Sequence, residues 1–159
     1  MNELKIAIFE LNGDTLATDV LCIKEIVKYQ NIEVLEDVPL YFEGFFDYRG
    51  YMVPIINLNA KFRFGKSEAT KKTKIIITIT NDEYIGFVVN DVKSILNIYE
   101  NEVENMPDIA HRQGKNFLKK VIKKDNDIIA ILDIKQILTK DEVEFVYKLR
   151  ETYLKNKIN

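Results

Sequence analysis

Several residue types that build chemical sites are scarce in this sequence. The chain has one cysteine, Cys22, one histidine, His111, and no tryptophan. A disulfide needs two cysteines and a structural zinc site needs about four cysteine or histidine ligands, so neither is expected. A Cys–His catalytic pair is formally possible, but we interpret Cys22 as a small core side chain and His111 as an exposed loop residue. We therefore expect no enzyme activity, no catalytic residues, no metal and no cofactor.

Long apolar runs and an excess of basic charge are also missing. No stretch approaches the 18 apolar residues of a membrane span, and the first residues lack the basic start of a signal peptide. The 23 basic residues face 25 acidic ones, whereas a general phosphate-binding surface needs a basic excess. With six glycines and three prolines, low-complexity linkers are excluded. We expect a cytoplasmic globular protein without direct membrane insertion and without nucleic acid.

What is present favours β-structure. The chain has 22 Ile and 12 Val against 13 Leu and 6 Ala, and β-branched side chains pack well on pleated sheets. Turn-forming residues at 12–14, 49–50, 81–83 and 125–126 separate apolar segments and predict hairpins. Pro54 suggests an edge strand or a bulge. Thr139 and Glu142 form a capping box that predicts a C-terminal helix over 139–159.

The two halves of the chain share a weak internal repeat. Residues 5–6, 12, 20 and 23–26 correspond to residues 69 positions later, and the strand at 53–58 corresponds to 129–134. The polar stretch 64–74 lies between the halves and is the best candidate for a linker. We expect a first unit over 4–64 and a second over 73–138. Units of about 65 residues are marginal alone, so the two should share an apolar interface.

Five segments, taken in order, resemble the CheW family of chemotaxis coupling proteins. They are Ile23-Lys24-Glu25-Ile26, Val38-Pro39-Leu40-Tyr41-Phe42-Glu43-Gly44, Asp47-Tyr48-Arg49-Gly50 with residues 53–58, Gly86-Phe87-Val88-Val89-Asn90-Asp91-Val92, and residues 129–138. The resemblance runs from about Leu4 to Leu154. It differs from the usual family pattern in having Asn57 and Asn90 in place of Asp, and Tyr48 in place of Leu.

The resemblance implies an all-β fold of two SH3-like five-stranded barrels packed side by side, with short helices and a C-terminal helix. It implies one CheW-like domain over 1–159 that acts as a non-enzymatic adaptor. The implied partners are the regulatory domain of a CheA-type histidine kinase and the cytoplasmic tip of a chemoreceptor, so the protein would be recruited to membrane-anchored receptor arrays. Two alternatives remain open: a module of the same family serving another signalling kinase, and a small-barrel nucleic-acid binder.

The candidate partner-binding residues fall in the motif segments. We expect Glu25 and Arg49 to pair with each other or to contact a partner, because a guanidinium presents a rigid fork of donors. We expect the apolar residues to contribute to one exposed contact patch, since interfaces often centre on aromatic and aliphatic anchors; these are Ile23, Val38, Phe42 and Phe45. Gly44 is interpreted as a turn residue that also lies near the partner.

Overall fold

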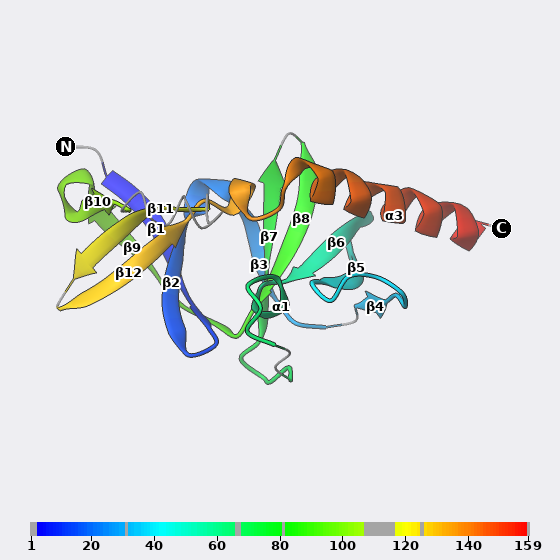
Figure 1. Ribbon diagram of the computed structural model, residues 1–159, viewed down its shortest axis with the longest axis horizontal. Coiled ribbons are helices and arrows are strands. Elements are labelled where there is room, and N and C mark those ends of the chain that lie inside the picture. The colour runs from blue at the N-terminus through cyan, green and yellow to red at the C-terminus, as the bar shows by residue number, and fades with distance from the viewer. Residues whose placement is uncertain are drawn as a thin grey trace.

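The fold consists of two β-sheets side by side and a long helix that crosses one of them (Figure 1). The computed structural model describes residues 3–30, 32–65, 68–80, 82–106, 117–124 and 126–158, with the side chains of 119, 124 and 158 excepted. His111 lies outside these residues. Among the described residues, no helix combines the length and apolar character that a membrane crossing requires.

Sheet A contains the first two strands of the chain and the last four. Its strand order is β10-β11-β12-β2-β1-β9. The strands are β1 (Glu3–Leu11), β2 (Asp14–Asp19), β9 (Asp91–Tyr99), β10 (Val103–Asn105), β11 (Leu118–Lys124) and β12 (Asp127–Leu132). The 3₁₀ helix η1 (Val20–Cys22) leads out of this sheet, η2 (Glu100–Glu102) joins β9 to β10, and η3 (Ile134–Gln136) follows β12.

Sheet B contains the middle of the chain. Its order is β3-β7-β8-β6-β5-β4, with β3 (Ile23–Lys28), β4 (Glu33–Val34), β5 (Phe42–Tyr48), β6 (Tyr51–Asn57), β7 (Lys74–Thr80) and β8 (Glu83–Val89). The short helix α1 (Leu58–Lys61) follows β6, and the long helix α3 (Lys140–Ile158) ends the chain. The Thr139–Glu142 capping box is present, because each residue bonds the backbone N–H of the other.

The internal repeat is real, and its two copies exchange their hairpins. The first copy places β1–β2 in sheet A and β3–β6 in sheet B, while the second places β7–β8 in sheet B and β9–β12 in sheet A. The register agrees: Ala17 pairs with Ile131 in a parallel ladder, and the corresponding Gly86 pairs with Ile55. Each sheet therefore takes a hairpin from one repeat and four strands from the other.

This exchange corrects the division into units 4–64 and 73–138. Both segments contribute strands to both sheets, and the polar stretch 64–74 connects two strands of the same sheet. The chain crosses between the sheets at η1 and again at Asn90, which alone separates β8 from β9. A polar stretch indicates an exposed connection, and an exposed connection need not be a boundary between barrels.

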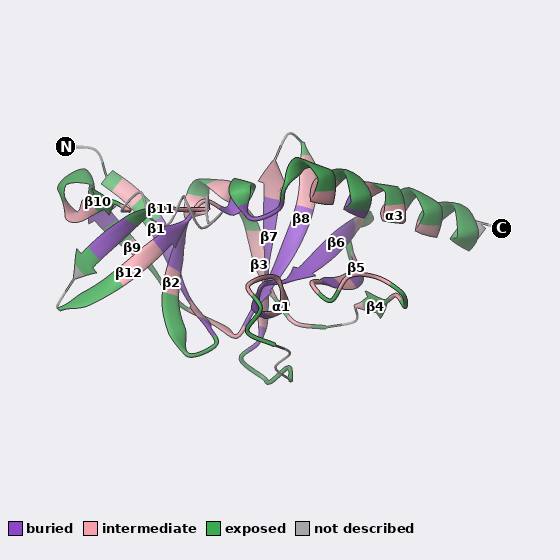
Figure 2. Cartoon of the chain, in the orientation of Figure 1, coloured by how far each residue is buried: buried purple, intermediate pink, exposed green. Residues whose placement is uncertain are grey.

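Sheet B is buried on both faces, which explains its continuous isoleucine run in β7. Ile75 and Ile77 point into a cluster enclosed by sheet B, while Ile76 points to the opposite side. Because successive side chains of a strand point to opposite faces, a strand covered on both faces is apolar throughout. A separate small cluster fills the interior of sheet A. The burial of the strands at the centre of the molecule is visible in Figure 2.

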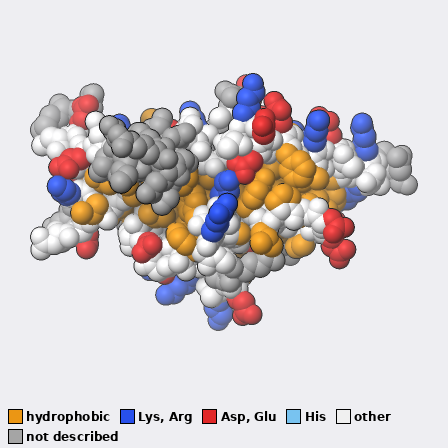
Figure 3. Space-filling view, viewed as in Figure 1, with side chains coloured by type: hydrophobic (Ala, Val, Ile, Leu, Met, Phe, Trp, Pro, Cys, Tyr) orange, Lys and Arg blue, Asp and Glu red, His pale blue; other side chains and the backbone are white. Residues whose placement is uncertain are grey.

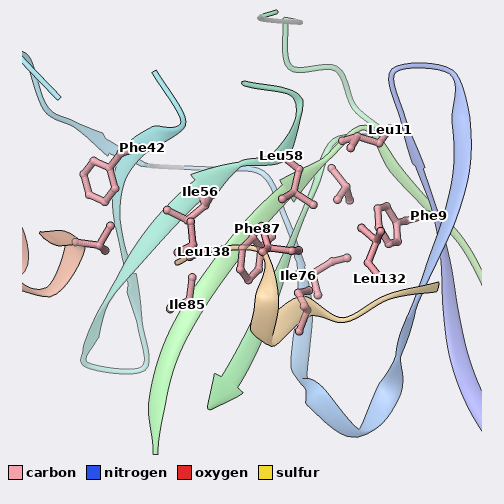
Figure 4. Close-up of a cluster of buried hydrophobic side chains, with 14 of the residues drawn as sticks. Phe9, Leu11, Phe42, Ile56, Leu58, Ile76, Ile85, Phe87, Leu132 and Leu138 are labelled. Carbon is pink, nitrogen blue, oxygen red and sulfur yellow. The ribbon is translucent and has the colours of Figure 1, made fainter. Parts of the chain in front are cut away.

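The largest cluster joins the two halves. Figure 4 shows Phe9, Leu11 and Leu132 from sheet A facing side chains of sheet B and its connections. Val146 of α3 is also fully buried in this cluster. The expected shared apolar interface is therefore confirmed, and the all-β class with a C-terminal helix is confirmed as well. Each sheet has six strands because it includes one strand of two or three residues.

Pro54 does not mark an edge strand. β6 lies between β5 and β8, but its pairing with β8 begins only at Ile55. Pro54 therefore precedes the ladder in which its missing N–H would be required.

Candidate functional site

The turn between β5 and β6 presents an arginine where the backbone favours other residues. Tyr48 pairs with Tyr51, so Arg49 and Gly50 form a two-residue hairpin loop with φ angles of 51° and 87°. Two positive φ angles in such a loop are typical of a type I′ turn, which favours Asn-Gly. The β1–β2 hairpin uses Asn12-Gly13, with φ angles of 52° and 83°. The turn itself therefore gives no reason for an arginine at position 49.

Arg49 shares a carboxylate oxygen of Glu25 with Tyr48. Arg49 Nη2 donates to Glu25 Oε1 at 2.8 Å, and the Tyr48 hydroxyl donates to the same oxygen at 2.7 Å. The Arg49 guanidinium also lies 5.1 Å from the centre of the Tyr48 ring. Burial, and next the hydrogen bond to Glu25, raise the pKa of the Tyr48 hydroxyl above its ordinary value.

The cluster Tyr48–Glu25–Arg49 combines a buried support with exposed charge. The Tyr48 side chain is buried, whereas the side chains of Arg49 and Glu25 are 67% and 37% exposed. Exposed ion pairs contribute only about 0–1 kcal/mol to stability. The Glu25–Arg49 pair therefore contributes little to the stability of the fold, and its charges are accessible to a partner protein.

The same cluster closes sheet B into a barrel. Three strands separate β3 from β5 in the sheet order, yet Glu25 of β3 contacts Tyr48 of β5. A second bridge repeats this closure at the other end of β3, where the Tyr29 hydroxyl donates to Glu43 of β5 at 2.7 Å. The sheet must curl for both contacts to form, as in the expected SH3-like barrel.

Asn57 gains a role from its departure from the family pattern. Its Oδ1 caps α1 by accepting from the Ala60 N–H at 3.0 Å. Its Nδ2 donates to Glu43 at 2.6 Å. An aspartate here could cap the helix but would place a second negative charge beside Glu43. The amide therefore stabilises the Glu43 carboxylate, which forms no ion pair among the described residues.

The apolar candidates separate into surface and core residues. Ile23 and Val38 are half-buried, pack against the shared cluster and remain accessible. Phe42 and Phe45 are only 3% and 1% exposed. The expectation of an exposed patch is therefore wrong for these two phenylalanines. Their rings contact each other at 5.3 Å, and Tyr153 of α3 covers Phe45 at 4.9 Å.

Gly44 is set by the backbone. Its φ is 144°, and a Cβ added there would lie 2.0 Å from the carbonyl oxygen of Glu33. The register of β5 against β6 also shifts between Phe42 and Gly44, which indicates a bulge. Gly44 thus allows β4 to approach β5 closely. This is a steric role at a position that is itself buried.

Two contacts of this region could not be identified from the sequence. One is the hydrogen bond from Tyr48 to Glu25. Its only signal is a tyrosine where the family pattern has leucine, since a hydroxyl in place of an apolar side chain indicates a hydrogen-bond partner. The cover that α3 forms over Phe45 had no local signal, because it joins residues 108 positions apart.

Removing the Tyr48 hydroxyl tests the support of the pair. We expect Tyr48→Phe to lower the free energy of unfolding by about 1–2 kcal/mol, because Glu25 loses a donor from a buried ring. Tyr51→Phe is the matched control: its ring contacts Tyr84 across the same turn, but its hydroxyl has no hydrogen-bond partner among the described residues. Urea unfolding of both variants measures the difference. Equal stabilities of the two variants would show that the Tyr48 hydroxyl does not hold Glu25.

Comparisons with known proteins agree on one family. The family model of the CheW-like domain matches residues 5–142. The chain is 27% identical over 137 residues to the chemotaxis protein CheW of Bacillus subtilis, covering 86% of this chain and 88% of that protein. It is 30% identical over 138 residues to the chemotaxis protein CheW of Thermotoga maritima, covering 87% and 89%.

A solved structure shares the fold. The crystal structure of the scaffolding protein TtCheW from Thermoanaerobacter tengcongensis superposes with a TM-score of 0.76 at 26% identity, covering 87% of this chain and 90% of that one. The family model includes both barrels, the Glu25–Arg49 pair and the start of α3. This chain belongs to the CheW-like domain family.

Proposed function

We propose that this chain is a non-enzymatic adaptor that couples chemoreceptors to a CheA-type histidine kinase. The observation that carries the proposal is the exposed Glu25–Arg49 pair, built on a turn that does not need an arginine. Similarity to proteins named for chemotaxis and for scaffolding supports it. Figure 3 shows hydrophobic side chains reaching the surface between charged ones, a pattern suited to protein contacts.

The two-barrel architecture suggests how one chain serves two partners. We assign the sheet B barrel to the kinase regulatory domain, through Arg49, Glu25 and the apolar surface near Val38. A groove of about 390 Å³ along sheet B and α3 lies on the same barrel. Contact with a rigid barrel would fix the position of the kinase, and this requires no catalytic residue in the adaptor.

We assign the receptor tip to the seam between the sheets. A groove of about 330 Å³ opens on the sheet A side of this seam. It is lined by strands of sheet A and by η1 and η3, with Cys22 and Ile134 among its residues. Ile23 follows η1 directly, and Leu21 beside it is 86% exposed. Burial raises the pKa of the Cys22 thiol, so the thiol stays uncharged and behaves as a small apolar side chain in the groove. A helical receptor tip docked there would contact sheet A at the point where η1 leads the chain into sheet B.

Coupling then follows from differential contact. A receptor that binds the groove differently in its two signalling states changes the contacts available to the kinase. The adaptor can shift the kinase equilibrium only by the difference in its binding free energy between the two signalling states.

A pull-down from the native cytoplasm tests the proposal. Mass spectrometry should identify a CheA-type kinase and chemoreceptors in the same eluate. Another signalling kinase without chemoreceptors would favour the alternative module of the same family. Nucleic-acid binding that weakens steeply with salt would favour the small-barrel nucleic-acid binder, which the net charge of −2 already disfavours.

A further inference from the structure

The last turns of α3 cover part of the sheet B barrel. The Tyr153 ring lies 4.9 Å from the ring of Phe45, which is buried beneath it. The Tyr153 hydroxyl donates to the carboxylate of Glu33 in β4, and Lys157 Nζ lies 3.6 Å from the same carboxylate. Figure 1 shows α3 running across sheet B and past β5 toward its far end. These contacts attach the end of the helix to the short edge strand β4.

The two ends of α3 are held very differently. The first turns are fixed by the capping box, by buried Val146 and by a half-buried Lys61–Glu142 pair at 2.7 Å. After Arg150, Tyr153 is the one described side chain that is not exposed. The Lys157–Glu33 pair is 56% and 55% exposed. Exposed pairs contribute little to stability, and helix ends open most readily, so this end is attached weakly.

The surface beneath this end is apolar and belongs to a motif segment. Phe45 and Phe42 contact each other in β5, and Val34 beside them on β4 is 71% exposed. The family model ends at residue 142, so the covering residues lie outside the matched region. Detaching the helix end would uncover the Phe45 ring at the edge of the barrel that we assign to the kinase.

We propose that residues 150–157 of α3 form a displaceable cover over Phe45, held by Glu33, which the kinase regulatory domain removes when it binds. The assignment of this surface rests on the proposed function, whereas the weak attachment is a property of the free protein. The cover gives a physical reason why an aromatic segment expected at an interface is buried in the isolated chain. It also makes the binding affinity depend on how firmly the helix end is attached.

Hydrogen exchange of the full-length free protein tests the attachment. Glu33→Gln removes the charge that Lys157 faces, so we expect amides of residues 150–157 to exchange about two- to fivefold faster while those of 140–147 are unchanged. Glu151→Gln is the matched control, because it removes an exposed carboxylate from the same helix end that forms no hydrogen bond or ion pair among the described residues. Unchanged exchange in Glu33→Gln would overturn the proposal.

Binding to the purified kinase regulatory domain tests the displacement. Glu33→Gln and Lys157→Gln, which weaken the attachment from opposite sides, should both tighten binding by about two- to fivefold. Exchange of residues 150–157 should accelerate in the complex. Slower exchange there, or weaker binding of both variants, would make the helix end part of the interface and overturn the cover. If no kinase domain binds at all, the proposed function fails while the exchange result on the free protein still stands.

Discussion

Arg49→Asn should weaken binding to the kinase regulatory domain by about 30-fold or more while leaving the fold intact. Truncating one partner of a desolvated interfacial charge pair costs about 2–5 kcal/mol, and about 1.4 kcal/mol corresponds to tenfold in affinity. The fold loses only an exposed ion pair, about 1 kcal/mol or less. Asparagine also suits the left-handed turn position better than arginine. Calorimetric titration with the kinase regulatory domain, with melting curves in parallel, measures both effects.

Arg63→Asn is the matched control for this variant. Arg63 is also an exposed arginine with a positive φ, of 64°, but it forms no ion pair among the described residues. The Arg63→Asn variant should bind the kinase regulatory domain as tightly as the wild type does. Glu25→Gln should resemble Arg49→Asn, and the double variant should be less than additive if the two residues act as a pair. A collapsed melting temperature in Arg49→Asn, with unchanged binding per folded molecule, would make Arg49 structural.

Gly44→Ala should destabilise the fold strongly. The added Cβ would meet the Glu33 carbonyl at 2.0 Å, and the φ of 144° is unfavourable for any residue with a side chain. Backbone strain and overpacking each cost about 1–3 kcal/mol, so we expect a melting temperature lower by on the order of 10 °C. Thermal unfolding followed by circular dichroism measures this change.

Gly13→Ala separates the clash from the strain. Gly13 also has a positive φ, of 83°, but a Cβ there would have no neighbour within 4 Å. It should therefore cost about 1 kcal/mol from backbone strain alone. If Gly44→Ala melts no lower than Gly13→Ala, the close approach of β4 to β5 does not constrain the fold.

Much of the local structure could be predicted from the sequence. Asn12-Gly13 and Arg49-Gly50 each mark a hairpin, because positive φ angles restrict the residues that a tight turn accepts. Thr139 and Glu142 identify the start of α3 for an equally local reason. The repeat offset of 69 also carries over to matching ladder registers.

The long-range arrangement could not be predicted in the same way. The reciprocal exchange of hairpins depends on which strands pair across the chain, and nothing local distinguishes β2 beside β12 from β2 beside β6. Phe45 was expected at the surface because its segment is aromatic, but it is buried in the core cluster and contacts Tyr153, which is distant in the sequence. The Glu25–Arg49 pair could be proposed, because both residues lie in motif segments. The hydrogen bond from Tyr48 to Glu25 could not, because it forms only when sheet B curls and brings β3 next to β5.

Bridging of receptor and kinase is the central claim, and cosedimentation tests it most directly. Vesicles carrying the receptor are mixed with the purified CheA-type kinase, with and without this protein, and pelleted. We predict that the kinase pellets well above background only when the protein is present, and that Arg49→Asn reduces the pelleted kinase while Arg63→Asn does not. A kinase that pellets equally without the protein, or a protein that pellets with the receptor and leaves the kinase in solution, would contradict the adaptor function.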